Sequence, residues 1–305
     1  MNRIISEMQG VMPGPLVICI GGLHGNENQG VDAFNRIVQG IKEHNIQIRG
    51  KIVGLTGNMR ALKTNQRFID YDLNRCWTQT FIDDVRRKDP DHYLSEDKEL
   101  LELDRLINHY LTEQNYTETV LVDLHTTSSE KGNFIVVPED EGSHSVINAL
   151  HLPVVIDLDK YLEGTLLQYF HKKGYTSFAF EGGMIGSDNA IDLHTSGIWE
   201  VLDAAGSIDQ HDHHDVDHYE NKLRSFAAKL PKTVKAFYRH WVDEEDQFEM
   251  RPGYFNFKPV KKGERLARDR HGPIVAPRDG LIFMPLYQKA GNDGFFLVDE
   301  INPED

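Results

Sequence analysis

The stretch LVICIGGLHGNENQG, residues 16–30, joins a short apolar run to a glycine-rich turn that carries a histidine and a carboxylate. Residues 16–20 have the length and composition of a buried strand. Two glycines follow, and Gly25 lies between His24 and Glu27. Because glycine permits a sharp turn, both side chains could face one metal ion. The alternative is that Glu27 opens a helix, where its charge suits the positive end of the helix dipole.

Apolar runs alternate with helical patterns through the first two thirds of the chain. Helices are expected at 28–44 and 96–111, where apolar residues recur every three or four positions, with Ser95 as the cap of the second. Further strands are expected at four places, residues 46–55, 120–124, 134–137 and 177–180. The alternation predicts an α/β fold with a mixed, largely parallel sheet flanked by helices. Ligands gather beyond the carboxyl ends of such strands, which is where His24 and Glu27 stand.

The sequence changes character near residue 206. The polar, histidine-rich segment DQHDHHDVDHYENK, residues 209–222, leads into a helical pattern from Tyr219 to about Trp241, with a break or kink expected at Pro231. Short apolar runs punctuated by glycine and proline follow and predict a small C-terminal all-β domain. The expected division is a catalytic α/β domain over 1–206, a histidine-rich linker and helix over 207–246, and a C-terminal β domain over 247–305.

Charge and cysteine content limit the partners and the compartment. The net charge of −15, without a basic patch, argues against nucleic acid, whose phosphates would be repelled. No apolar stretch approaches the ~20 residues that cross a bilayer, and the first residues lack the apolar core of a secretory signal. Two cysteines, Cys19 and Cys76, give no disulfide framework, which is typical of a reducing compartment. A cytoplasmic protein without a membrane partner is expected, and a homo-oligomer is left open.

A second histidine stands at the end of another apolar run, VLVDLH, residues 120–125. Adjacent strand ends lie close in a parallel sheet, so His24, Glu27 and His125 could converge. Two histidines and a glutamate with one open position form a catalytic zinc arrangement. Asp123, on the same strand face, could orient His125 from behind. The alternative is a structural histidine at the end of a strand.

Two further segments carry charged side chains suited to catalysis. Arg67, Asn74 and Arg75 belong to RFIDYDLNR, residues 67–75, and guanidinium groups grip a carboxylate with two hydrogen bonds. A surface loop with internal Asp–Arg pairs would have the same composition. Glu181 ends the run SFAFE and is followed by two glycines, so it could act as a general base on metal-bound water or be an ordinary loop glutamate.

Four motifs, taken in order, resemble those of the succinylglutamate desuccinylase/aspartoacylase family, a deacylase branch of the zinc carboxypeptidase fold. They are HGNE (24–27), RFIDYDLNR (67–75), DLHTT (123–127) and FEGG (180–183). The resemblance runs over most of the chain and implies one Zn²⁺ per chain, held by His24, Glu27 and His125.

The same resemblance implies roles for the remaining residues. Glu181 matches the base that activates zinc-bound water, and Arg67 matches the arginine that steadies the oxyanion. Asn74 and Arg75 match the residues that grip the substrate carboxylate. The implied function is a zinc-dependent amidohydrolase that releases a free amino acid and a carboxylate from a small-molecule N-acyl amino acid.

The chain departs from the aspartoacylase pattern at two places. A second arginine is expected shortly before the base, where this chain has His171, Lys172 and Lys173. A tyrosine is expected from the C-terminal domain, where the segment GNDGFF offers Phe295 and Phe296, although Tyr287 lies a little earlier. Both changes argue against N-acetylaspartate and favour an N-acyl amino acid with a less acidic or larger side chain.

Two other functions remain open. One is a zinc metallocarboxypeptidase that trims peptides with the same site. The other is a non-enzymatic metal-binding protein that uses the histidine cluster His211, His213, His214 and His218. A solvated linker that happens to carry histidines is the simpler interpretation of that cluster.

Overall fold

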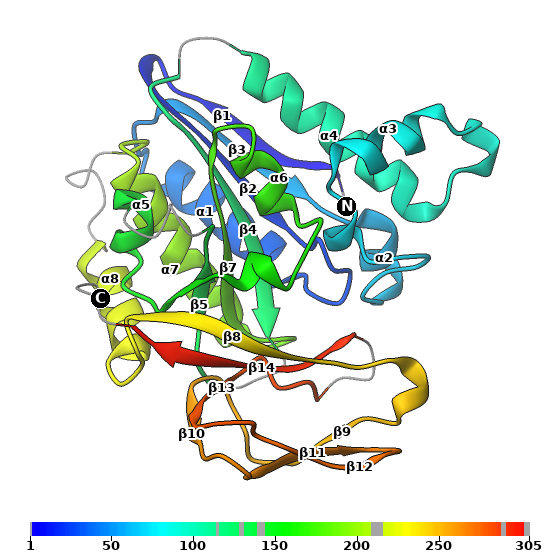
Figure 1. Cartoon of the computed structure of the whole chain (residues 1–305). Coiled ribbons are helices and arrows are strands. Elements are labelled where there is room, and N and C mark those ends of the chain that lie inside the picture. The colour runs from blue at the N-terminus through cyan, green and yellow to red at the C-terminus, as the bar shows by residue number, and fades with distance from the viewer. Residues whose placement is uncertain are drawn as a thin grey trace.

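The computed structural model of this chain describes residues 2–113, 116–127, 131–138, 144–208, 216–287 and 291–301. Over these residues an eleven-stranded sheet forms the centre of the molecule, in the order β1-β3-β2-β4-β7-β5-β6-β8-β14-β13-β10 (Figure 1). Its strands are β1 (Ile4–Gln9), β2 (Met12–Gly21), β3 (Arg49–Thr56), β4 (Thr119–Thr127), β5 (Phe134–Val136), β6 (Val154–Ile156), β7 (Thr176–Met184), β8 (Thr233–Trp241), β10 (Lys258–Val260), β13 (Gly280–Phe283) and β14 (Asp293–Glu300). A smaller sheet, in the order β12-β11-β9, joins β9 (Glu249–Met250), β11 (Arg265–Asp269) and β12 (Gly272–Val275).

The centre of the large sheet is parallel, as the alternation of strands and helices predicted. β3, β2, β4 and β7 lie side by side and run in one direction. β1 and β5 flank this block with antiparallel pairings. The carboxyl ends of the four parallel strands therefore meet along one edge of the sheet.

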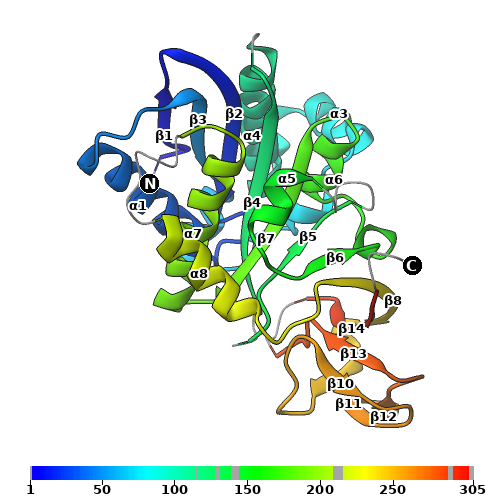
Figure 2. The same ribbon diagram turned by 90° about the vertical axis from the view of Figure 1, so that its left-hand side faces the viewer.

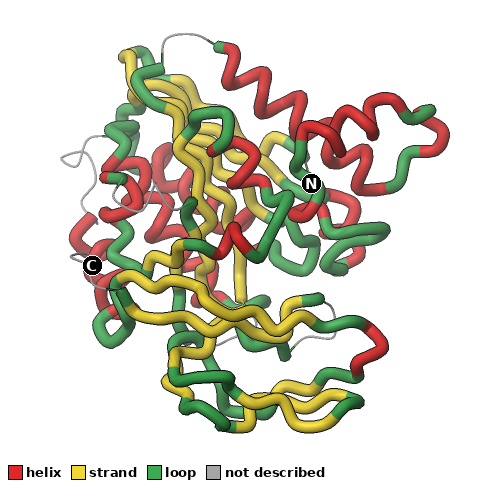
Figure 3. The backbone as a smooth tube through the Cα atoms, viewed as in Figure 1, coloured by secondary structure: helices red, strands yellow, loops and turns green. Residues whose placement is uncertain are grey.

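Helices cover both faces of this sheet (Figures 2 and 3). On one face lie α1 (Gln29–Glu43), α5 (Ser145–Ala149), α7 (Asp188–Ala204) and α8 (Val216–Ala227). On the other lie α2 (Met59–Thr64), α3 (Gln79–Arg87), α4 (Ser95–Thr112) and α6 (Leu166–His171). Short 3-10 turns are η1 (Leu73–Arg75), η2 (Pro90–His92), η3 (Leu158–Lys160) and η5 (Glu244–Asp246).

Packing of α1 against the sheet explains its apolar stripe. Phe34 and Ile37 are fully buried, and each such side chain stabilises the fold by about 1.5–3 kcal/mol relative to exposure. Gly54 in β3 makes room for this contact, because a Cβ there would lie 2.2 Å from the ring of Phe34. The start of α1 also lies close to the end of β2, because a Cβ on Gly21 would lie 2.6 Å from the backbone nitrogen of Val31.

The helix expected from Tyr219 to about Trp241 is wrong in its second half. α8 ends at Ala227, and β8 forms after Pro231. In β8 the buried residues Val234 and Ala236 alternate with partly exposed ones, which is the period of a strand. Pairing with β6 on one side and β14 on the other outweighs the local helical pattern.

The predicted cap of α4 is also wrong. Leu94 occupies the cap position, and its N–H donates to Asp97 Oδ2 at 2.9 Å. Ser95 is the first residue of the helix, and its N–H donates to Asp70 Oδ2 at 2.6 Å. Asp97, three positions after Leu94, thus accepts the hydrogen bond at the start of α4, and the hydroxyl of Ser95 does not act as the cap.

The C-terminal region is all-β, as predicted, but its strands extend the central sheet. β8 pairs in parallel with β6, and β14, β13 and β10 follow with antiparallel pairings. One apolar cluster joins Phe134 of β5 to Phe283 and Phe296 of the C-terminal strands. The boundaries 1–206, 207–246 and 247–305 remain a prediction. Among the described residues, no helix is both long and apolar enough to cross a membrane.

Candidate active site

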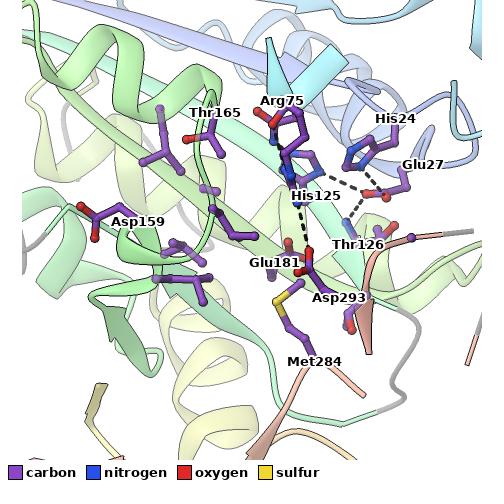
Figure 4. A pocket seen from close by; sticks show the side chains of 18 of the residues that line it. His24, Glu27, Arg75, His125, Thr126, Asp159, Thr165, Glu181, Met284 and Asp293 are labelled. Atoms are coloured by element: carbon purple, nitrogen blue, oxygen red, sulfur yellow. Dashed lines mark hydrogen bonds and ion pairs between the residues drawn. The ribbon is translucent and has the colours of Figure 1, made fainter. Parts of the chain in front are cut away.

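Three predicted metal ligands come together at the carboxyl edge of the parallel strands. His24, Glu27 and His125 are buried, and their ligand atoms all lie within 4.8 Å of one another. Glu27 sits between the two imidazoles, with Oε1 2.9 Å from His24 Nδ1 and Oε2 3.3 Å from His125 Nδ1 (Figure 4). The backbone N–H of Thr126 also donates to Glu27 Oε2 at 2.8 Å. Two nitrogen donors and a carboxylate in one buried place could hold a metal ion.

The register of β2 and β4 brings these side chains together. Gly21 at the end of β2 lies opposite Leu124, so the turn after β2 stands beside His125. Gly22 has φ +72°, the left-handed conformation that favours glycine. Gly25 is needed for a different reason, because a Cβ there would lie 2.2 Å from the backbone of Ala61. The glycines of the turn therefore serve both its curvature and its close packing on α2.

Each histidine is held from behind by a carboxylate. Asp123 Oδ2 lies 2.7 Å from His125 Nε2, as the sequence predicted, and Asp72 Oδ1 lies 3.3 Å from His24 Nε2. Such partners fix the ring so that the Nδ1 atoms face Glu27. Burial would lower the pKa of His125, but Asp123 and Glu27 outweigh it and raise that pKa well above its usual range. The site thus stabilises positive charge, and this fits a bound cation.

Glu181 lies in β7, next to His125 in the register of β4 and β7. It is buried, and its Oε2 has no hydrogen-bond partner among the described residues. Burial, reinforced by the negative charges of Glu27 and Asp123, raises the pKa of Glu181 to about 8, although His125 opposes the shift. A carboxyl group with a pKa near neutrality and a free oxygen can exchange a proton with a reacting group.

Arg67 lines the same cavity as the three candidate ligands. Its Nη2 donates to Asp72 Oδ2 at 3.1 Å, and its Nη1 lies 3.8 Å from Glu27 Oε1. Burial would lower the pKa of Arg67, but Asp72 and Glu27 raise it. The guanidinium therefore stays charged beside the three candidate ligands.

Sequence reasoning missed the residue that holds the loop of Arg67. Glu96, fully buried in the first turn of α4, accepts hydrogen bonds from Ile69 N at 2.8 Å and Asp70 N at 2.9 Å. It also accepts one from Asn58 Nδ2 at 2.9 Å. The sequence shows only an acidic residue at a helix start, which is common without any such role.

Asn74 and Arg75, predicted to bind a substrate carboxylate, both line the cavity. Asn74 is buried; its Oδ1 accepts from Leu166 N at 2.9 Å and its Nδ2 lies 3.2 Å from His125 Nε2. Arg75 Nη2 lies 3.4 Å from Asp293 Oδ2. The two side chains thus stand on the wall next to the candidate ligands.

Gly291 and Asp293 of the C-terminal segment GNDGFF line the cavity, and sequence reasoning missed Asp293. Phe295 and Phe296 are fully buried in the apolar clusters of the β region and do not line the cavity. His171, Lys172 and Lys173 do not line it either, and Lys173 Nζ lies over the ring of Tyr169 at 4.1 Å. The residues that stand in place of the second arginine and of the tyrosine in the aspartoacylase pattern therefore do not reach the cavity.

A buried histidine behind the site was also missed. His194 in α7 is fully buried, and its Nε2 lies 2.9 Å from the backbone oxygen of His125. Burial lowers the pKa of His194 to about 4, so it is neutral and donates from Nε2. The tetrapeptide DLHT occurs at both 123–126 and 192–195, but a repeat of four residues does not predict a place behind the site.

Apolar side chains from both the earlier part of the chain and the C-terminal β region line the cavity. The first two thirds of the chain supply Val136, Leu158, Leu162 and Leu167, and the C-terminal β region supplies Met284, Pro285 and Leu286. An open cleft adjoins the cavity and shares Arg67, Arg75, Leu162, Leu286, Gly291 and Asp293 with it. His211, His213 and His214 lie outside the described residues, and His218 is exposed in α8, away from the cavity.

Comparison with known proteins agrees with this geometry. The model of the succinylglutamate desuccinylase/aspartoacylase catalytic domain matches residues 13–186. A probable aspartoacylase of Acaryochloris marina is 29% identical over 126 residues, which are 41% of this chain and 39% of that protein. A succinylglutamate desuccinylase of Pseudomonas putida is 24% identical over 265 residues, 81% of this chain and 71% of that protein.

A solved structure shares the fold of the whole chain. The crystal structure of a succinylglutamate desuccinylase/aspartoacylase from Rhodobacter sphaeroides aligns with a TM-score of 0.67 at 17% identity. The alignment covers 97% of this chain and 88% of that one. The C-terminal β region is therefore part of the shared architecture.

Proposed function

Because this chain belongs to the succinylglutamate desuccinylase/aspartoacylase family, we propose that it is a zinc-dependent amidohydrolase that cleaves an N-acyl amino acid. The products are a free amino acid and a carboxylate. The observation that carries the proposal is the convergence of His24, Glu27 and His125 in one buried cavity, with Glu181 beside them.

One Zn²⁺ per chain is the metal that this donor set suits best. Two imidazole nitrogens and one carboxylate, with a position left for solvent or substrate, are typical of catalytic zinc. When bound, zinc polarises the scissile carbonyl group and lowers the pKa of water at the site. The carboxylates of Asp123 and Asp72 keep the two imidazoles oriented with Nδ1 toward Glu27, so that the three side chains would hold the ion together.

Glu181 is the proposed proton carrier. Its free Oε2 takes a proton from the attacking water and later passes it to the nitrogen of the leaving amine. Arg67 donates hydrogen bonds to the carbonyl oxygen as negative charge develops there. Loss of such a donor costs about 3–4 kcal/mol of transition-state stabilisation in other enzymes.

Arg75 and Asn74 are the proposed carboxylate-binding residues. If the N–H at His125 Nε2 donates to Asp123, this nitrogen carries a hydrogen and cannot accept a hydrogen bond from the side-chain amide of Asn74. Both hydrogens of the Asn74 amide then remain for the substrate. Arg75, partly exposed at the cavity wall, would supply the charge.

A metallocarboxypeptidase is the second candidate. The open cleft next to the cavity carries Phe68, Tyr161 and Trp241, and it would admit a chain longer than an acyl group. The same catalytic residues would then cleave a C-terminal peptide bond.

Two free, buried cysteines, Cys19 and Cys76, suit a cytoplasmic setting for either reaction.

Amine release from a panel of substrates tests the proposal. Zinc-loaded protein is expected to hydrolyse N-acetyl amino acids faster than peptides that share the same C-terminal residue. Chelation should abolish the release and added Zn²⁺ should restore it. Preference for the peptides would favour the carboxypeptidase, and no release from any N-acyl amino acid would refute the proposal.

Zinc content tests the ligands independently of activity. His125→Ala is expected to lose the ion in elemental analysis, because one of three protein donors is gone. His218→Ala, which removes an exposed histidine of α8, serves as the matched control and should keep one zinc per chain. Unchanged zinc in His125→Ala would exclude that residue as a ligand.

A further inference from the structure

One ion-pair chain links the two halves of the molecule at the cavity wall. Asp293, the first residue of β14, lies between two arginines. Its Oδ1 accepts from Arg239 Nε at 2.6 Å, and its Oδ2 lies 3.4 Å from Arg75 Nη2. Figure 4 shows Asp293 pointing across the cavity toward Arg75, on the side of His125 and Glu181.

Arg239 fixes Asp293 more firmly than Arg75 does. Besides its short contact with Asp293, Arg239 donates from Nη1 to the backbone oxygen of Tyr161 at 2.5 Å. Its guanidinium carbon also lies 4.3 Å from the ring centroid of Trp241. Asp293 therefore has a partner that keeps it in place when Arg75 turns to a substrate.

The arginines at the cavity already have acidic neighbours. Among the described residues that line it, the guanidinium groups are those of Arg67 and Arg75. Arg67 is paired with Asp72, and Arg75 faces Asp293. The other acidic side chains at the wall are Glu27, Glu181 and Asp159. One substrate carboxylate can be met by Arg75, but the described residues that line the cavity offer no further unpaired guanidinium or ammonium group to a second.

The rest of the wall suits an uncharged group. Leu158, Leu162 and Leu167 line one side, and Met284 and Leu286 line the side of the C-terminal region. An additional carboxylate would lose its water against this surface without gaining a partner, which is costly for a charged group. It would also be repelled by Asp293, and like charges repel more strongly in a partly dry cavity than in water.

We propose that Asp293 is a specificity-determining residue that restricts this site to N-acyl amino acids with one carboxylate. The inference rests on the proposed function and deepens it. Arg75 takes the α-carboxylate, Asp293 stays on Arg239, and its negative charge rejects an acidic side chain or a dicarboxylic acyl group. Substrates with neutral side chains and neutral acyl groups are accepted.

N-acetylglutamine and N-acetylglutamate provide a nearly isosteric pair that differs by one negative charge. With zinc-loaded wild-type protein, kcat/KM is expected to be at least tenfold higher for N-acetylglutamine. Asp293→Asn should reduce this ratio at least tenfold, mainly by lowering the KM for N-acetylglutamate. A change in overall packing would instead affect both substrates alike.

Asp299→Asn is the matched control, because Asp299 lies on the same strand but pairs with Arg278 at the surface, 2.6 Å away. It should leave the ratio unchanged. Equal rates for the two substrates in the wild type, or an unchanged ratio in Asp293→Asn, would overturn the inference. The ratio of kcat/KM for N-acetylglutamine to that for N-acetylglutamate in the wild type tests the inference even if Asp293→Asn does not fold.

The outcome that refutes the proposed function is different. In that case neither N-acetyl amino acid is hydrolysed by zinc-loaded protein. Calorimetric binding of the same two compounds to the wild type then still tests the charge preference. Equal or tighter binding of N-acetylglutamate would reject the role of Asp293.

Discussion

Glu181 and His125 illustrate how single residues acquire their chemistry from their surroundings. Glu181 has a buried, unpartnered oxygen and a pKa raised to about 8, mainly by burial. His125 has a carboxylate on each side and a pKa raised well above its usual range, although burial opposes the rise. The surroundings thus favour the protonated, neutral form of Glu181 and the protonated, positive form of His125, although both stand at the same strand edge.

Glu181→Gln tests the role of the carboxylate. The amide has nearly the same shape but cannot accept a proton, so turnover should fall by about 10²–10⁴-fold, the usual contribution of a general base. Zinc content should stay at one per chain, because Glu181 is not among the proposed ligands. Steady-state amine release and elemental analysis measure the two quantities. Full activity in this variant would remove Glu181 from the mechanism.

At the scale of secondary-structure elements, α4 supports the site from a distance. Its buried Glu96 accepts from three backbone N–H groups of the loop that carries Arg67 and from the side chain of Asn58. Glu99, one turn on and also fully buried, accepts from the backbone N–H of Arg60 at 3.2 Å. The helix start thus positions the loop between α2 and η1.

Glu96→Gln should weaken this support. One acceptor oxygen is replaced by a donor that faces other donors, which we expect to cost about 1–3 kcal/mol in the free energy of unfolding. Activity should fall as well, because Arg67 loses its fixed place. Urea unfolding and amine release provide the measurements. Glu102→Gln, in the same helix but partly exposed, is the control; similar losses in both variants would contradict a specific role for Glu96.

The repeated tetrapeptide DLHT shows that elements are not decided by a few residues. At 123–126 it lies in the buried strand β4, and at 192–195 it lies in the helix α7. His125 faces Glu27 in the first case, and His194 reaches the backbone of His125 in the second. The flanking sequence and the packing partner choose between strand and helix.

At the scale of the whole molecule, one sheet passes through both halves of the chain. β6 of the catalytic half pairs with β8, which pairs with β14 of the C-terminal region. The apolar cluster of Phe134, Phe283 and Phe296 crosses the same boundary. The cavity takes its walls from both halves, so the relative position of the two determines its shape.

Phe296→Ala tests whether the halves unfold together. Removing a fully buried phenylalanine should cost about 3–5 kcal/mol and lower the midpoint of one common thermal transition by roughly 5–15 °C. Differential scanning calorimetry measures the number of thermal transitions and their midpoints. Val275→Ala, an exposed position in the smaller sheet, should change little. Two transitions, of which only one moves, would instead support a separate domain over 247–305.

The sequence alone determined the parallel centre of the fold and the set of candidate ligands. The buried strands β2 and β4 contain the apolar runs LVICI and VLV, and the glycine-rich turn places His24 and Glu27 directly after the first of them. These features depend on neighbours along the chain, so they are visible in a linear pattern. The first strand, β1, escaped notice because its residues are mostly exposed or half-buried.

Only the tertiary structure decided the identity of β8, the inward position of Asp293 and the support by Glu96. A helix was expected over the residues of β8, and the strand forms through pairing with two partners distant in sequence. Asp293 meets Arg75 across 218 positions of the chain. Such contacts depend on how the sheet is assembled, and no spacing within the sequence encodes that assembly directly. The physical reason is that the free energy gained by burial and strand pairing between remote segments exceeds the intrinsic helix and strand propensities of the residues, and sequence-based expectations depend on those propensities.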